Sequence, residues 1–294
     1  LHEPDTEKMI TELPRFVRPH EYQKHLNFAS EYLLSLPNKA SLRVNGKLPL
    51  FRKKYSYDIL NLLIKFNIYL AKLLEQVNIK IGLINYTNFI KNKPYVIVWK
   101  SIESFARIGL LLEAKKNLSL VYIIRHPCGQ IASVLNGEDS NFFVSNSSIS
   151  EDYGYFEALN DIEFIQEKKY NLDSVKEMSQ IQKLALRWAM INDQAIEAIE
   201  KHSERATVVR YEDFCIDPKG QAKKIFSKTN LSWNNQTANF CEKNKSESNS
   251  YYSVVKIPEK SMNKWKKQLT EKEVNEIKQI VIDSKAGQLF KNFF

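Results

Sequence analysis

The stretch Leu118–Leu135, LSLVYIIRHPCGQIASVL, decides the fold that we predict for this chain. It begins with a short apolar run in which all of the residues Val121–Ile124 are β-branched or aromatic. Such a run suits a strand that is buried on both faces, as in a parallel sheet. Pro127 suits the first turn of a helix, and apolar residues then follow at helical spacing, as at Ile131 and Leu135. We therefore predict a strand, a tight turn and a helix.

Arg125 lies where this predicted strand ends, and Ser133 follows eight residues later on the predicted helix. Open α/β sheets bind ligands at the carboxyl ends of their strands, and the N–H groups of a helix N-terminus favour an anion. A guanidinium, a hydroxyl and a helix N-terminus together predict a phosphate site. The alternative is that Arg125 caps the sheet edge or pairs with a carboxylate, while Ser133 only packs.

Two further segments, Pro94–Trp99 and Ala206–Arg210, also have the composition of buried strands. Strands that alternate with helices predict a parallel sheet with right-handed crossovers. We therefore expect an α/β fold, a central parallel sheet flanked by helices, and a single domain over residues 1–294. Residues 138–173 are rich in Asn, Ser, Asp and Tyr and have little periodicity, which predicts an insertion or lid.

Local signals predict several other elements. Apolar spacing predicts helices over Glu21–Leu36, Tyr57–Gln76 and 102–114, and an apolar run predicts a short strand over Ile79–Tyr86. Capping signals predict three more helix starts, at Ser174–Glu177, at Asp217-Pro218 and at Thr270–Glu273.

Composition narrows the possible ligands and the cellular compartment. The 43 Lys+Arg against 34 Asp+Glu give a net charge of +9, which suits an anionic ligand, a nucleic acid or a membrane surface alike. The three cysteines are far apart and form no C-x-x-C pair, so we expect a reducing, cytoplasmic location. The most apolar window, Ile59–Leu74, is interrupted by Lys65 and Lys72, so we expect no membrane span. The five histidines have no ligand spacing, and we expect no metal site.

The series Arg125, Pro127 and Ser133 resembles the segment that binds the 3′-phosphate in sulfotransferases dependent on 3′-phosphoadenosine 5′-phosphosulfate (PAPS). Other matches occur in the family's order between about Lys100 and Lys267, over half of the chain. They are a lysine after a strand, a tryptophan on a long helix, a Tyr-Glu-Asp after a strand, and a tail with a serine and a lysine beside a tryptophan. In this sequence these features are Lys100, Trp188, Tyr211–Asp213, Ser253–Pro258 and Asn263–Lys266.

The resemblance implies a fold similar to that of P-loop NTPases and transfer of a sulfuryl group from PAPS to a hydroxyl or amine. It implies that Arg125, Ser133 and Lys264 hold the 3′-phosphate, and that Tyr211 and Ser253 help to bind the nucleotide. Lys100 would stabilise the negative charge that grows on the leaving phosphate oxygen. Each residue also has an ordinary structural alternative: Lys100 can be a solvated strand end, Trp188 can be core packing, and the tail can be a basic surface loop.

The chain departs from the family at two points. Cytosolic sulfotransferases follow the lysine with Thr-His, whereas Lys100 is followed by Ser101 and Ile102, so the chain resembles the tyrosylprotein and carbohydrate type more closely. None of the eight glycines lies in a 5′-phosphosulfate loop of the form Pro-Arg-Ser-Gly-Thr-Thr. The start of the chain, His2-Glu3-Pro4, resembles a later point of the family, so we expect the sequence to begin after that strand and loop. Glu3 is then the candidate base, unless it is an ordinary terminal glutamate.

Two other functions stay open at this point. Another nucleotide-dependent phosphotransferase would need a Gly-Lys-Ser/Thr loop and a magnesium carboxylate, and no such loop is present. A non-catalytic module on a degenerate sulfotransferase fold would bind a nucleotide or nucleic acid. The lysines are scattered and not interleaved with stacking aromatics, which disfavours nucleic acid. We expect a nucleotide co-substrate and an acceptor as partners, and the sequence names neither the acceptor nor the oligomeric state.

Overall fold

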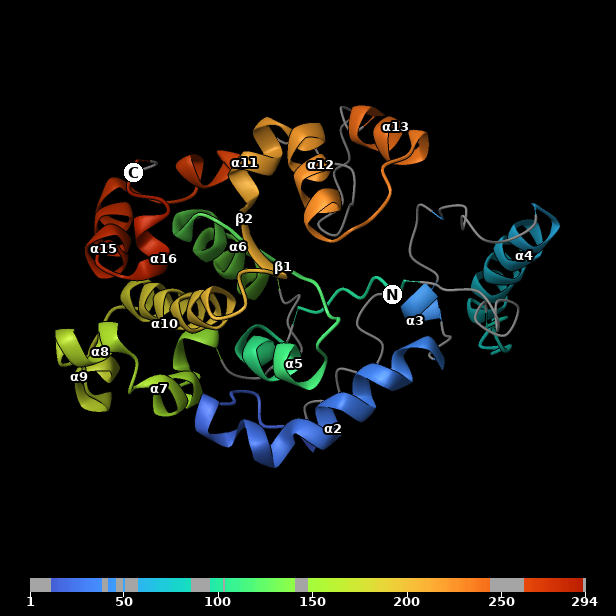
Figure 1. Ribbon diagram of the computed structural model, residues 1–294. Helices are drawn as coiled ribbons and strands as arrows, with labels where there is room; N and C mark the ends of the chain where they lie inside the picture. Colours follow the sequence, from blue (N-terminus) through green and yellow to red (C-terminus); the bar gives the residue numbers. More distant parts are fainter. Residues whose placement is uncertain are drawn as a thin grey trace. The chain divides into compact units, whose positions relative to one another are not determined.

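The computed structural model describes residues 12–38, 42–45, 50, 58–85, 96–102, 104–140, 148–243 and 262–292. Internal contacts divide the chain into two compact units, Leu1–Lys115 and Lys116–Phe294. The sequence predicts one domain, and each unit is described here by itself. The described part is mostly helical, with a small parallel sheet of two strands flanked by helices (Figure 1).

The first unit is built from helices. Its core is formed where α2 packs on α5, and Leu110, Leu111 and Leu112 of α5 are fully buried. The predicted helices Glu21–Leu36 and Tyr57–Gln76 are confirmed as α2 and α4, each of which is shorter by one residue at each end. The elements are η1 (Pro19–Glu21), α2 (Tyr22–Ser35), η2 (Leu36–Asn38), α3 (Leu42–Asn45), α4 (Asp58–Glu75), η4 (Phe105–Arg107) and α5 (Ile108–Ala114).

Two strands predicted in this unit are not found in its described residues. Residues 96–99, the described part of Pro94–Trp99, have no regular structure, and Lys100 forms a single bridge. Val96 and Val98 are exposed, so this apolar run is not buried as the prediction of a core strand requires. Residues 79–85 are not a strand either, because the side chain of Asn67 makes two of the hydrogen bonds that a strand would offer to a neighbour. The Ile84 N–H donates to Asn67 Oδ1 (2.9 Å), and Asn67 Nδ2 donates to the Gly82 carbonyl (3.3 Å).

The helix predicted over 102–114 begins later than expected. The Ser104 N–H donates to Ser101 Oγ (3.1 Å), and this local turn competes with a helical start. The 3-10 helix η4 follows, and α5 begins only at Ile108.

The second unit contains the sheet. Strands β1 (Leu120–Ile124) and β2 (Ala206–Arg210) are parallel, with Leu120 opposite Ala206 and Ile124 opposite Arg210. Both strands agree with the predicted segments. Figure 1 shows the pair between α6 and the helices α11 and α12, with α10 close by.

The elements of this unit are mostly helices, and α15 and α16 pack against α10. They are α6 (Pro127–Asp139), η5 (Ile149–Glu151), α7 (Gly154–Leu159), α8 (Glu163–Lys168), α9 (Leu172–Lys176), α10 (Gln180–Glu200), α11 (Tyr211–Ile216), α12 (Pro218–Lys228), α13 (Asn235–Lys243), η6 (Lys264–Lys267), α15 (Glu271–Val281) and α16 (Lys285–Gln288).

The long helix α10 is buried along most of its length and organises the unit. Its apolar face is buried throughout, and it consists of Ile181, Leu184, Trp188, Ile191, Ala195 and Ile199. The capping box predicted at Ser174 is wrong, because Ser174 lies inside α9 and Ser179 caps α10 with Gln182. The caps predicted at Asp217 and Thr270 are confirmed at the starts of α12 and α15.

The region 138–173 is more regular than its composition suggests. Its described parts, 138–140 and 148–173, contain the end of α6, then η5, α7, α8 and the first residues of α9, and Tyr155, Phe156 and Leu159 of α7 are buried. Two ion pairs join it to α10, from Lys183 to Glu151 (3.0 Å) and from Arg187 to Asp152 (3.1 Å). These contacts fix the segment against α10.

Candidate functional site

The carboxyl ends of β1 and β2 place four side chains at one edge of the sheet. Because Ile124 is paired with Arg210, the next residues of both strands emerge together. Arg125 and His126 leave β1, and Tyr211 and Glu212 leave β2 as the first residues of α11. The predicted ligand edge therefore carries a cation, an aromatic ring and a carboxylate.

Arg125 is half-buried and is held from several sides. Its guanidinium carbon lies 5.2 Å from the centre of the Tyr211 ring, a cation–π geometry. Its carbonyl oxygen accepts a hydrogen bond from Trp188 Nε1 of α10 (3.2 Å). A Cβ on Gly129 would lie only 3.0 Å from Arg125 Nε, so the guanidinium rests on the first turn of α6 where that helix has no side chain.

Helix α6 begins at the same edge. Its N-cap is His126 and Pro127 occupies the first helical position, as predicted. The geometry of an α-helix leaves its first N–H groups without intrahelical acceptors, and its dipole favours an anion there. Ser133 is half-buried and lies one turn beyond Gly129, which places it on the helix face that Arg125 contacts.

The imidazole of His126 is buried against two aromatic rings. It stacks on Trp265 with ring centres 5.1 Å apart and planes 5° apart, and it meets Phe290 edge-on at 5.4 Å. Burial, together with the nearby cations Lys266 and Arg125, lowers the pKa of His126 to about 4. His126 is therefore neutral at pH 7. Its ring is a packing element between these two aromatic side chains.

Trp265 attaches a basic segment to α6. It is the one buried residue of η6, and its indole Cδ1 would lie 3.5 Å from a Cβ on Gly129. Lys264, Lys266 and Lys267 flank it on the exposed side. Lys266 Nζ lies 5.6 Å from the centre of the Trp265 ring. The stack with His126 thus holds three lysines near the end of β1.

The structure brings together four of the seven predicted site residues. Arg125 lies between β1 and α6, and its guanidinium faces the Tyr211 ring. Ser133 lies on α6, and Lys264 lies on η6, which packs against α6. Lys100 is exposed and belongs to the first unit. Glu3 and Ser253 lie outside the described residues.

Three neighbours of Arg125 were not predicted as site residues: Gly129, Glu212 and Trp265. Glu212 had a signal in the sequence, because it follows a predicted strand at the same edge as Arg125. Trp265 belongs to the tail segment that contains Lys264, but the sequence does not predict its stacking on His126, because the two residues are far apart in the chain. Gly129 had no signal, since its importance comes from what packs on it.

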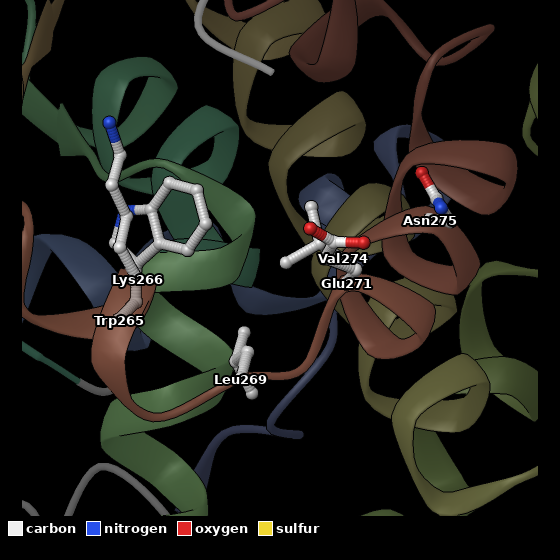
Figure 2. Close-up of a pocket in the computed structure, with 6 residues that line it drawn as sticks. All are labelled: Trp265, Lys266, Leu269, Glu271, Val274 and Asn275. Atoms are coloured by element: carbon white, nitrogen blue, oxygen red, sulfur yellow. The ribbon is translucent and has the colours of Figure 1, made fainter.

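A small cavity of about 310 Å³ lies beside this edge (Figure 2). Trp265, Lys266 and Leu269 line it from η6 and the following turn, and Glu271, Val274 and Asn275 line it from α15. Neither Arg125 nor Ser133 lines it, so it is distinct from the predicted phosphate site.

The part of the chain that the structure describes offers neither a metal site nor a membrane span. No group of three or more His, Cys, Asp or Glu among its residues could hold a metal ion. Within the same residues, no helix is long and apolar enough to cross a membrane.

Comparisons with models of protein families, with curated proteins and with solved structures found no match for this chain.

Proposed function

We propose that this protein is a sulfotransferase that moves a sulfuryl group from PAPS to a hydroxyl or amine and releases 3′-phosphoadenosine 5′-phosphate (PAP). The observation that carries this proposal is the setting of Arg125. Its guanidinium lies between the Tyr211 ring and the first turn of α6, at the carboxyl edge of a parallel strand pair. A cation and a helix N-terminus at such an edge suit a nucleotide phosphate.

Five residues bind the nucleotide in this proposal. Arg125 and Ser133 bind its 3′-phosphate, and Lys264 approaches the same phosphate from the basic segment that Trp265 attaches to α6. The Tyr211 ring holds the guanidinium and lies beside the nucleotide. Ser253 completes the set from outside the described residues.

The chemistry requires two further groups. An acceptor oxygen or nitrogen attacks the sulfur while the bond from sulfur to the bridging phosphate oxygen breaks, so the electron pair of that bond leaves with PAP. A base, for which we propose Glu3, takes the acceptor's proton. Lys100 stabilises the charge that develops on the leaving oxygen. The three cysteines form no disulfide, which supports a reducing, cytoplasmic setting for this reaction.

The proposal is tested by measuring PAP release from PAPS in the full-length protein with a panel of alcohol, phenol, sugar and amine acceptors. Replacement Lys100→Ala should lower turnover by about a hundredfold or more, because this cation acts mainly in the transition state. Nucleotide affinity should change much less. Lys24→Ala removes an exposed lysine from α2 of the same unit and serves as the control.

Two outcomes contradict the enzymatic proposal in different ways. If Lys100→Ala transfers sulfate at the parent rate, Lys100 is only a solvated residue. If the parent protein binds PAP and transfers nothing to any acceptor, the protein is a non-catalytic binder of the nucleotide.

A further inference from the structure

Glu212 is a buried carboxylate at the carboxyl edge of the sheet, and it takes no part in the proposed transfer of the sulfuryl group. It is the second residue of α11, two positions after the end of β2, and only 2% of its surface is exposed. Its Oε1 accepts a hydrogen bond from the backbone N–H of His126 (3.0 Å). Its Oε2 has no hydrogen-bond partner among the described residues.

The bond to His126 replaces a bond that the sheet cannot make. The strands are paired up to Ile124 and Arg210, but β2 then turns into α11 and no longer offers a backbone acceptor to the neighbouring strand. The His126 N–H is buried, and a buried N–H without an acceptor destabilises the fold. The Glu212 carboxylate supplies that acceptor from the opposite strand end.

A buried carboxylate is a costly acceptor for this hydrogen bond, because its charge loses hydration. Burial raises the pKa of Glu212, whereas the bond from His126 and the nearby Arg125 and Arg210 lower it. A neutral side chain could accept the same bond without placing a negative charge beside the arginine that we assign to a phosphate. Its cost would be offset if Glu212 fixes the geometry of that arginine.

We propose that Glu212 is a positioning residue, which holds the turn between β1 and α6 so that Arg125 and the first N–H groups of α6 point at one anion. Arg125 directly precedes His126, and α6 begins directly after His126. A bond to the His126 N–H therefore restrains both at once. This role rests on the proposed function, because the anion is the 3′-phosphate of the nucleotide.

The test compares two variants by calorimetry with PAP and with AMP, which lacks the 3′-phosphate. Glu212→Ala removes the acceptor and should lower the affinity for PAP by about tenfold, a loss of about 1.4 kcal/mol, while the affinity for AMP stays unchanged. Glu212→Gln keeps an acceptor oxygen and removes the charge, so it should bind PAP at least as well as the parent. Glu157→Ala, on the exposed side of α7, is the control.

If Glu212 only neutralised Arg125, both variants would bind PAP more tightly, and that result would overturn the positioning role. A loss of affinity for both nucleotides in equal measure would also overturn it, because it would reflect general damage to the fold.

A measurement without ligand separates this inference from the proposed function. Hydrogen exchange of the His126 amide should be slow in the parent and in Glu212→Gln, and about tenfold or more faster in Glu212→Ala at equal global stability. If the parent shows no preference for PAP over AMP, the proposed function fails, and the exchange rates still decide whether Glu212 holds the turn. Equal exchange in all three proteins would show that it does not.

Discussion

At the scale of single residues, His126 has an unusual environment for a histidine. Its ring is enclosed by Trp265 and Phe290, while its backbone N–H is bound by Glu212. A charged imidazolium would lose its hydration in this enclosure and would face Lys266 and Arg125. The neutral form of His126 is therefore part of the folded state.

This neutrality predicts a dependence of stability on pH. The pKa of His126 is about 4 in the folded protein against 6.5 ordinarily, so the unfolded chain binds the proton more readily between these values. The contribution of His126 is fully present above pH 6.5 and is lost as the pH falls toward 4. It amounts to about 3 kcal/mol in the free energy of unfolding.

Urea unfolding at several pH values measures this contribution. The parent should lose more stability between pH 7 and pH 4 than His126→Phe, which keeps a ring against Trp265 and cannot be protonated. Replacement of the exposed His20 by Phe should leave the parent's pH dependence in place. Identical pH dependence in the parent and in His126→Phe would contradict the buried, neutral imidazole.

At the scale of secondary-structure elements, the first turn of α6 decides the geometry of the site. Both Arg125 and Trp265 approach it at Gly129, where a Cβ would lie 3.0 Å from Arg125 Nε and 3.5 Å from Trp265 Cδ1. The missing side chain therefore allows a guanidinium and an indole to pack on the same turn. The guanidinium is itself part of the proposed phosphate site, and the indole holds the neighbouring Lys264 near that site.

Replacement of Gly129 by Ala should have opposite effects on binding and stability. The new methyl group would displace the Arg125 guanidinium by a few tenths of an ångström, and PAP affinity should fall by roughly tenfold, the worth of one charge-assisted contact. Alanine is the better helix former by up to about 1 kcal/mol, so thermal stability should stay equal or rise.

Gly154→Ala is the matched control, since a Cβ there makes only an ordinary contact at 3.4 Å with the side chain of Asp152. Parent affinity for PAP in Gly129→Ala would show that Arg125 is not held against α6 for binding.

At this scale the sequence predicts those elements whose signals are local. The helix at Pro127 and the cap at Thr270 need only neighbouring residues, and both are present. The strand before Arg125 also forms, because Ala206–Arg210 pairs with it. The strands predicted over Pro94–Trp99 and Ile79–Tyr86 needed a partner strand, and apolar content alone does not supply one. The stack of His126 on Trp265 joins residues 139 positions apart, and no pattern in either segment predicts it.

In the molecule as a whole, the predicted site residues divide between the two units. Arg125, Ser133, Tyr211 and Lys264 belong to the second unit, whereas Lys100 belongs to the first. Binding of the 3′-phosphate can therefore be tested apart from the transfer step that we assign to Lys100. The order of the matching motifs along the chain predicted this site more strongly than any one of them.

The most direct test of the account is calorimetry of the full-length protein with PAP and with AMP. We predict that PAP binds at least about tenfold more tightly, because a charge-assisted arginine contact is worth on the order of 1.5–3 kcal/mol. Arg125→Ala should remove most of this preference. Lys272→Ala, which removes a lysine whose side chain is 87% exposed, should preserve it. Equal affinity of the parent for PAP and AMP would contradict the assignment of Arg125 to a 3′-phosphate, and with it the proposed function.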